Sequence, residues 1–170
     1  MLKTVLNRLK PLAEGVCQSY IANDIQVADL IEWIVSQTGP ADVDITSFSI
    51  SEEFLRRIFF MRKKMPIKRL RIVIDFKATH KTLKLWPFIA QTVEHCFLSS
   101  NHSKVILVDG EDMKVAVVTS QNLTRGNRFE SASIIVDDDN FGIIKDYLEN
   151  LIKYQSVPFD ELYRETIGDD

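Results

Sequence analysis

The sequence lacks the features that mark several classes of protein. Its 170 residues include two cysteines, Cys17 and Cys96, and neither belongs to a CxxC pair, which excludes a disulfide scaffold. No apolar run approaches the ~18 residues that a membrane-spanning helix needs. The first ten residues also lack the continuous apolar stretch of a signal peptide. We therefore expect a cytoplasmic protein with reduced thiols and no membrane partner.

Glycine and proline are scarce as well, and neither sign of charge is in large excess. The chain has 6 glycines, 5 prolines and a formal net charge of −3, from 21 basic and 24 acidic residues. No repeat and no Gly/Ser linker divides it. Hydrophobic residues make up 45% of the chain, which is too much for a disordered protein. We predict one domain over residues 1–170, large enough to fold without disulfides or metal.

The apolar periodicity changes along the chain between that of helices and that of strands. Gly39 favours the end of one helix, Ser51 favours the start of the next, and the turn at 110–113 favours an antiparallel hairpin. The order predicts an α/β fold, a mixed β-sheet flanked by helices on both faces, with a helical extension over 1–40 packed on a core over 42–153. Helices are predicted at 2–14, 24–37, 52–64, 81–96 and 141–154, strands at 42–50, 70–75, 104–109, 114–119 and 131–136, and a short helix or loose end from 157 onward.

Polar side chains gather at the ends of two of these strands. His102 and Lys104 lie two residues apart where one strand starts, and Ser120 and Asn122 have the same spacing where its hairpin partner ends. Side chains at i and i+2 leave the same face of a strand. We therefore expect an imidazole, an ammonium, a hydroxyl and an amide at one edge of the sheet, with Glu130 following before the next strand.

These groups suit the chemistry of a phosphodiester. An imidazole can attack phosphorus, while ammonium and amide donors neutralise the nonbridging oxygens in the transition state. A carboxylate such as Glu130 can hold the second nitrogen of the His102 ring and fix its tautomer. Each residue alone is commonly structural, as a solvated strand end or a turn former, so the prediction depends on the whole set.

The order of these residues resembles the HKD motif of the phospholipase D superfamily. The resemblance covers about residues 42–153 and implies the phospholipase D-like form of a mixed αβ sheet. Two features depart from the family pattern: Thr119 stands where the family usually has glycine, and the hairpin after Asp109 is a few residues longer. The matching pieces are His102-x-Lys104-x4-Asp109, Ser120-x-Asn122 and the later acid Glu130.

Enzymes of this superfamily use two histidines, but this chain has one motif. His80 and His95 lack the rest of the motif, and we expect both to be structural, with His95 inside a helix. The resemblance therefore implies a homodimer whose two-fold axis passes through the active site. His102 of one subunit would form a phosphohistidine, and His102 of the other would protonate the leaving oxygen and then activate water.

The resemblance also assigns the remaining roles. The ammonium and the amide would hold the phosphate, the carboxylate would orient the imidazole, and the hydroxyl would add a hydrogen bond. No metal and no cofactor is implied. Asp109 is expected to be structural, because it ends the strand that Lys104 begins. The residues implied to carry the reaction are His102, Lys104, Asn122, Glu130 and Ser120.

A basic cluster favours nucleic acid, and DNA in particular, as the substrate. Eight Lys and Arg residues lie between Arg56 and Arg71, with no acid from Phe54 to Ile74, enough for several phosphate contacts. The C-terminus of a helix favours such residues in any case. Small single-motif members of the superfamily are mostly nucleases, so we predict a metal-independent phosphodiesterase, an endonuclease. The predicted substrate contacts are Arg62, Lys63, Lys64, Arg125 and Arg128.

Two other functions fit the same fold. A catalytically inactive nucleic-acid-binding module would bind in a salt-dependent way without turnover. A phospholipase would need an element that binds membranes, and the amphipathic helix at 24–37 has Asp24, Asp29 and Glu32 on its polar face. Anionic membranes would repel that face, which favours the nuclease.

Overall fold

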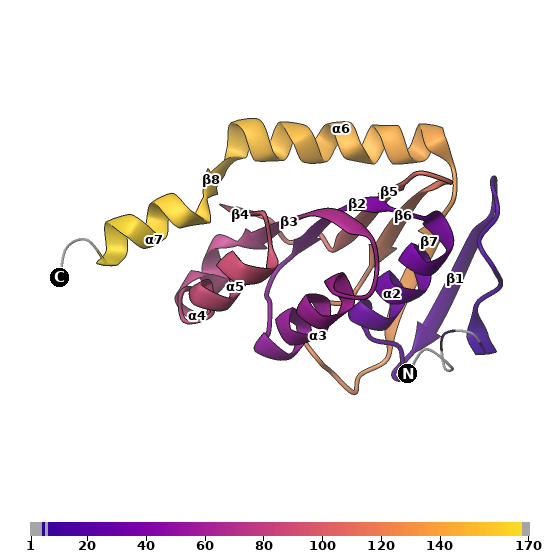
Figure 1. Cartoon of the computed structure of the whole chain (residues 1–170), viewed down its shortest axis with the longest axis horizontal. Coiled ribbons are helices and arrows are strands. Elements are labelled where there is room, and N and C mark those ends of the chain that lie inside the picture. The colour runs from indigo at the N-terminus through magenta and orange to yellow at the C-terminus, as the bar shows by residue number, and fades with distance from the viewer. Residues whose placement is uncertain (1–4, 6, 168–170) are drawn as a thin grey trace.

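A computed structural model describes residue 5 and residues 7–167 (Figure 1). Its strands are β1 (Cys17–Ala22), β2 (Ala41–Ser47), β3 (Ile67–Asp75), β4 (His95–Ser99), β5 (Val105–Gly110), β6 (Lys114–Thr119), β7 (Glu130–Ile135) and β8 (Ser156–Pro158). They form one sheet in the order β1-β7-β6-β5-β2-β3-β4-β8. β3 is parallel to β2 and to β4, and the other neighbouring pairs are antiparallel. The sheet is therefore mixed, and the α/β prediction is confirmed.

One edge of this sheet collects the strand ends that carry the polar residues. Because β5 is antiparallel to β2 and β6, it begins where they end, and Val105 is paired with both Thr46 and Val118. β7 begins beside the end of β6, where Ala132 is paired with Thr119. The carboxyl ends of β2, β3, β4 and β6 therefore lie at the same edge as the starts of β5 and β7.

Helices cover both faces of the sheet, as the sequence predicts. They are α2 (Val27–Thr38), α3 (Glu52–Arg62), α4 (Thr79–Leu83), α5 (Trp86–Thr92), α6 (Asp138–Gln155) and α7 (Phe159–Ile167), with a 3-10 turn at Phe76–Ala78. The helices α2 to α5 lie on one face, α6 crosses the other, and α7 follows β8 at the end of the sheet (Figure 1). Within the described part of the chain, no helix is both long and apolar enough to cross a membrane.

The residues predicted to bound the helices do so. Gly39 has φ +69°, in the left-handed region, at the end of α2. The Ser51 hydroxyl accepts a hydrogen bond of 3.3 Å from the Phe54 amide at the start of α3. α2 then buries its apolar side completely, Leu30 and Ile34 included, and each such side chain stabilises the fold by roughly 1.5–3 kcal/mol.

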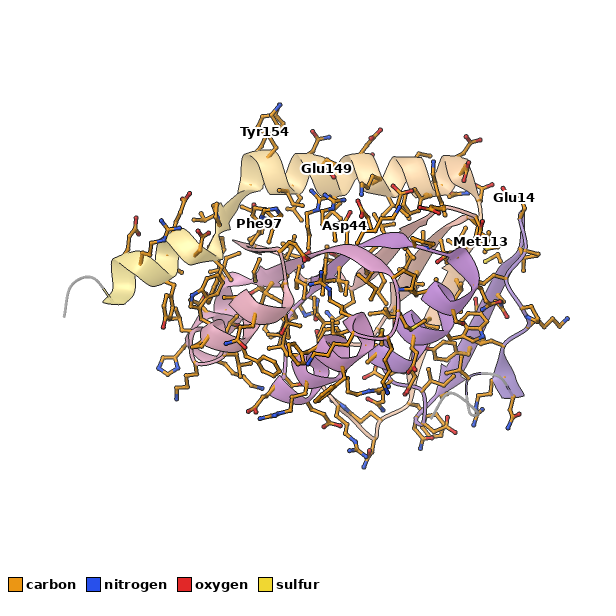
Figure 2. All side chains as sticks on the ribbon, viewed as in Figure 1. Glu14, Asp44, Phe97, Met113, Glu149 and Tyr154 are labelled. Atoms are coloured by element: carbon orange, nitrogen blue, oxygen red, sulfur yellow. The ribbon has the colours of Figure 1, made fainter. Side chains whose placement is uncertain are left out.

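A buried cluster of charges holds α6 on the sheet. Asp44 on β2 and Arg71 on β3 are register partners, and Arg71 donates two hydrogen bonds to the Asp44 carboxylate, at 2.6 and 2.9 Å. From α6, Lys145 donates to Asp44 at 2.5 Å and Glu149 pairs with Arg71. Figure 2 labels Asp44 and Glu149 on the two facing elements. Burial opposes the charge on Asp44, but the hydrogen bonds from Arg71 and Lys145 outweigh it and hold the pKa of Asp44 below its ordinary value.

The N-terminal segment differs from the prediction. Of the described residues in the helix predicted at 2–14, residues 5, 7 and 8 are helical and 9–14 are not, and Leu2 and Leu6 lie outside the described residues. β1 instead pairs with β7 along its whole length, so the segment 1–40 is not a purely helical extension and supplies one strand of the sheet. Two of the six β1 side chains are buried, which is too few to give a clear strand pattern.

The helix predicted at 81–96 is also wrong in part. Pro87 lies in the first turn of α5, where its missing N–H costs nothing, so two short helices replace the long one. The chain then forms β4, and His95 lies in a strand instead of a helix. β4 is stabilised by pairing with β3, a tertiary contact that its five residues do not announce. The tail forms β8 and α7, where a short helix or a loose end is predicted.

The Arg71 cluster predicts a specific loss of stability. Arg71→Met leaves a buried carboxylate short of its bidentate partner and should lower the free energy of unfolding by about 3–5 kcal/mol, measured by urea denaturation at pH 7. Arg56→Met is the matched control, because the exposed pair of Arg56 with Glu52 should contribute at most ~1 kcal/mol. Similar losses in both variants would contradict the role of the cluster.

The same cluster sets a dependence of stability on pH. The pKa of Asp44 is lower in the folded state than its ordinary value, so its stabilising contribution is complete above the unfolded pKa of about 3.9 and disappears as the pH falls through the folded pKa. The free energy of unfolding of the wild type should therefore fall below pH ~4 more steeply than that of Arg71→Met.

Candidate active site

His102 and Lys104 lie in the short segment that leads into β5. The His102 side chain is exposed, and its ring makes an edge-to-face contact with the Phe48 ring, with the ring centroids 5.2 Å apart. The Lys104 ammonium donates a hydrogen bond of 2.8 Å to the His102 carbonyl oxygen. The imidazole is therefore supported on one side by an aromatic ring and is open to solvent on the other, as a nucleophile requires.

Two carboxylates act on the Lys104 ammonium. Burial lowers the pKa of Lys104, and the negative charges of Glu130 and Asp75 oppose that lowering. Glu130 begins β7 and Asp75 ends β3, so the charges reach Lys104 from strands that lie on different sides of β5 in the sheet. Their opposing effect favours the charged ammonium, which is the form that can neutralise a phosphate.

Asn122 is held with its amide nitrogen free for a ligand. Its Oδ1 accepts a hydrogen bond of 3.2 Å from the Phe48 backbone N–H, so its Nδ2 is left to donate elsewhere. The neighbouring residue Leu123 ties the segment down, since its N–H donates to the Ser49 carbonyl and its carbonyl accepts from the Ser51 N–H. Phe48 thus contacts both Asn122 and His102, and joins the two halves of the predicted site.

Glu130 contacts Ser120 in this structure. The Ser120 hydroxyl donates to the Glu130 carboxylate and accepts from the Ser131 N–H at 3.0 Å. No hydrogen bond joins Glu130 to His102 among the described residues. The structure therefore brings all five predicted residues to the same sheet edge, with the carboxylate directed at the hydroxyl and acting on Lys104.

Thr119, the departure from the family pattern, has a structural role at this edge. Its hydroxyl donates to the Ser131 carbonyl at 2.7 Å and accepts from the Gln121 N–H at 3.1 Å. Its N–H donates to the Lys104 carbonyl at 3.0 Å. The threonine therefore joins β7, the start of β5 and the loop that carries Asn122, so the fold accommodates it in place of glycine.

Arg125 and Arg128 lie close to the predicted catalytic residues. Both line a small hollow together with Asn122 and Glu130. Arg125 also forms an exposed ion pair of 3.2 Å with Glu53, which is weak enough for a phosphate to replace. These two arginines are positioned to contact a substrate at the site.

Arg62, Lys63 and Lys64 lie at the other end of the sheet. α3 starts beside the site, where Ile50 forms a bridge with Leu123, and runs back along the strands. Arg62, its last residue, donates to the Thr92 carbonyl and pairs with Glu94 just before β4 begins. The structure therefore separates these three residues from His102, and any contact they make with a substrate would be remote from the reacting phosphate.

The basic cluster is also less free than its sequence suggests. Six of its eight side chains form ion pairs with acids from other segments or from the preceding helical turn. Lys63 lies over the Phe59 ring at 4.2 Å. Acids distant in the sequence, such as Asp29 and Glu94, supply the missing negative charge. The paired residues are Arg56, Arg57, Arg62, Lys68, Arg69 and Arg71.

Solved structures provide a comparison for this arrangement, while no family model and no curated protein matches the sequence. The match to Nuc from Salmonella typhimurium, a phospholipase D family member, covers 84% of this chain and 97% of Nuc, with a TM-score of 0.65 and 15% sequence identity. The match to phosphatidylserine synthase from Haemophilus influenzae covers 85% of this chain and 41% of the synthase, with a TM-score of 0.58 and 14% sequence identity. The match to TrmBL2, an archaeal chromatin protein with a novel mode of DNA binding, covers 91% of this chain and 57% of TrmBL2, with a TM-score of 0.56 and 9% sequence identity.

The chain has the phospholipase D fold. The match covers almost the whole length of Nuc, whereas this chain spans less than two thirds of the length of phosphatidylserine synthase and of TrmBL2. The fold implied by the motif is thereby confirmed. Within this phospholipase D fold, the five motif residues lie at the edge where the carboxyl ends of β2, β3 and β6 meet the starts of β5 and β7.

Residues that the sequence did not single out support the motif in this phospholipase D fold. Asp75 is buried at the end of β3 and accepts a hydrogen bond of 3.0 Å from the Asn101 N–H. Asn101, also buried, immediately precedes His102. One signal could have found them: a polar residue that ends a predicted buried strand, or flanks a motif residue, lies at the edge where the site forms.

The orientation of Asn122 predicts how phosphate binds. Asn122→Asp keeps an acceptor for the Phe48 N–H but replaces the Nδ2 donor with a negative oxygen. The affinity for inorganic phosphate, measured by isothermal titration calorimetry, should fall at least ~10-fold, since a hydrogen bond to a charged group contributes about 1.5–3 kcal/mol. Asn150→Asp, which makes the same charge change on the exposed side of α6, should leave the affinity unchanged. An equal loss in both variants would contradict the proposed contact.

Proposed function

We propose that this chain is a metal-independent phosphodiesterase, and specifically a nuclease. The observation that carries the proposal is the convergence of an exposed imidazole with two phosphate-binding donors at one sheet edge. His102 contacts Phe48, and the Phe48 N–H orients Asn122, while Lys104 is bonded to the His102 carbonyl. A phosphate bound by the ammonium and the amide would lie next to the imidazole.

The proposed reaction has two steps. In the first, a ring nitrogen of His102 attacks phosphorus, the bond to the leaving oxygen breaks, and a second imidazole donates its proton to that oxygen. In the second, the same second imidazole takes a proton from water, the water oxygen attacks phosphorus, and the bond to His102 breaks. Lys104 and Asn122 neutralise the nonbridging oxygens in both steps.

The second imidazole would come from a second copy of the chain. His95 does not serve, because it lies at the start of β4, at the sheet edge opposite the one where His102 leads into β5. His80 lacks the lysine, serine and asparagine that accompany His102 in the motif. A two-fold axis at the site edge would bring the His102 of each copy to the same phosphate. Phe129, 73% exposed beside Glu130, is an apolar side chain at this edge that such a contact would cover.

Nucleic acid is the substrate class that the surroundings favour. Arg125 and Arg128 line the hollow beside Asn122, and cations next to a reacting phosphate suit a chain of phosphodiesters. The likeness to Nuc and to a DNA-binding chromatin protein supports the same choice. A binding module without turnover and a phospholipase are the alternatives, and the assay below separates them.

His102→Ala should abolish cleavage and leave the fold intact. We expect the wild type to cleave single- or double-stranded DNA in the presence of EDTA, and the variant to be slower by a factor of about 10⁴ or more, since nucleophile and acid are lost together. His95→Ala, an exposed histidine on β4, is the matched control and should retain activity. Salt-dependent DNA binding without cleavage by the wild type would favour the binding module. Hydrolysis of phospholipid vesicles instead of DNA would favour the phospholipase.

The shared site predicts a dominant effect in mixed dimers. Light scattering should give a mass of about 39 kDa, twice the 19.5 kDa of the chain. When equal amounts of wild type and His102→Ala are unfolded and refolded together, about one quarter of the dimers contain two intact histidines, so the activity should fall to ~25% of an equal total amount of wild type. A value of ~50% would show that each chain acts alone.

A further inference from the structure

Behind the motif, a chain of buried and half-buried hydrogen bonds fixes the segment that carries it. The Asn101 N–H donates to the Asp75 carboxylate at 3.0 Å, and the Ser103 N–H donates to the Asn101 side-chain oxygen at 3.1 Å. The Val105 N–H donates to the Thr46 hydroxyl at 3.0 Å. The backbone N–H groups of residues 101, 103 and 105 are therefore held by side chains, and they alternate with His102 and Lys104.

The side chains of this network also bond to one another. The Ser103 hydroxyl donates to the Asn101 side-chain oxygen at 2.5 Å, so it accepts from the Thr46 hydroxyl, 2.8 Å away. The hydrogen bonds run in one direction from Val105 through Thr46 and Ser103 to Asn101. They end at Asp75, which joins the segment to the end of β3. A network in which each member is satisfied favours one conformation.

Asp75 is unusual within this network because it is a buried carboxylate without a cationic partner at bonding distance. Its side chain is 6% exposed, and its oxygens accept from two backbone groups, the Asn101 N–H and the Lys77 N–H at 2.7 Å. No ion pair involves it among the described residues. A buried carboxylate held in this way lies where its charge acts on the site.

We propose that Asp75 is a positioning residue of the active site, which anchors the 101–105 segment to the end of β3 and places a buried negative charge directly behind that segment. The inference rests on the proposed phosphodiesterase function and adds to it a residue outside the motif. Asp75 contacts no substrate in this scheme. It acts through Asn101, which sets the backbone on either side of His102, and through its charge.

The electrostatic part of the proposal follows from the groups around Lys104. Burial lowers the pKa of Lys104, while Glu130 from β7 and Asp75 from β3 oppose the lowering. His102 is the other titratable group of the segment. Removing the charge of Asp75 therefore lowers the pKa of Lys104 further. The ammonium would lose its proton at a lower pH, and with it the ability to neutralise the phosphate.

Asp75→Asn tests both parts of the proposal. It removes the charge and one of the two acceptors, so we expect kcat to fall by about tenfold or more, because a small misplacement of reacting groups has effects of that size. The basic limb of the pH–rate profile should move to lower pH. Asp109→Asn is the matched control: it makes the same change at the far end of β5 and should alter neither quantity.

Thr46→Val separates anchoring from charge and serves if Asp75→Asn fails to fold. It removes the hydroxyl that links Val105 to Ser103 and leaves every charge in place. We expect a lower kcat with an unchanged pH profile. If both Asp75→Asn and Thr46→Val keep the wild-type kcat, anchoring is refuted. If the basic limb of folded Asp75→Asn stays in place, the electrostatic role is refuted.

A readout that is independent of turnover keeps this inference separate from the proposed function. The titration of Lys104, followed by NMR of ¹³C-labelled lysine and assigned with Lys104→Arg, should move to lower pH in Asp75→Asn and stay in place in Asp109→Asn. This shift is expected even if the wild type cleaves no nucleic acid, a result that would refute the proposed function alone. An unchanged Lys104 titration beside an active wild type would refute the electrostatic role of Asp75 and leave the function standing.

Discussion

The bidentate contact between Arg71 and Asp44 is the constraint on which the rest of the structure depends. It joins β2 to β3 at the centre of the sheet. From α6, Lys145 donates to Asp44 and Glu149 pairs with Arg71. Because a buried charge is costly unless it is paired, this cluster favours the position of α6 that pairs Lys145 with Asp44 and Glu149 with Arg71. α6 in turn leads into β8, which closes the sheet against β4. The face opposite the helices α2 to α5 is thereby fixed by charge instead of by apolar packing alone.

The same sheet explains why the proposed catalytic groups come together from distant parts of the chain. The antiparallel pairing of β5 with β2 and β6, and of β7 with β6, and the parallel pairing of β3 with β2, make the ends of β2, β3 and β6 meet the starts of β5 and β7 at one edge. His102 lies just before β5 and Asn122 just after β6, and both contact Phe48, which follows β2. A site built on strand ends in this way needs little reorganisation to bind a phosphate, which is how preorganised donors stabilise a transition state.

The sequence predicted the parts of this fold that depend on local pattern. The five strands with strong alternation or a buried run are present. His102 and Lys104 lie at the predicted edge, but they precede β5 and are not part of the strand. What it missed depends on distant pairing. β4 is stabilised by β3, which its own five residues do not show, and Arg62 is neutralised by Glu94, more than thirty residues away in the chain. The position of a charge in sequence therefore did not indicate whether that charge is free.

The pairing of β1 with β7 has a consequence for how the protein forms. Ala22 is the partner of Glu130 and Cys17 is the partner of Ile135, so two strands separated by most of the chain must meet. Contacts of such long range form late, because a large loop has to close first. During synthesis, the His102 segment can pair with β2 while the Glu130 side of the edge is still absent. The nascent chain therefore completes the set of five proposed site residues only after β7 has left the ribosome.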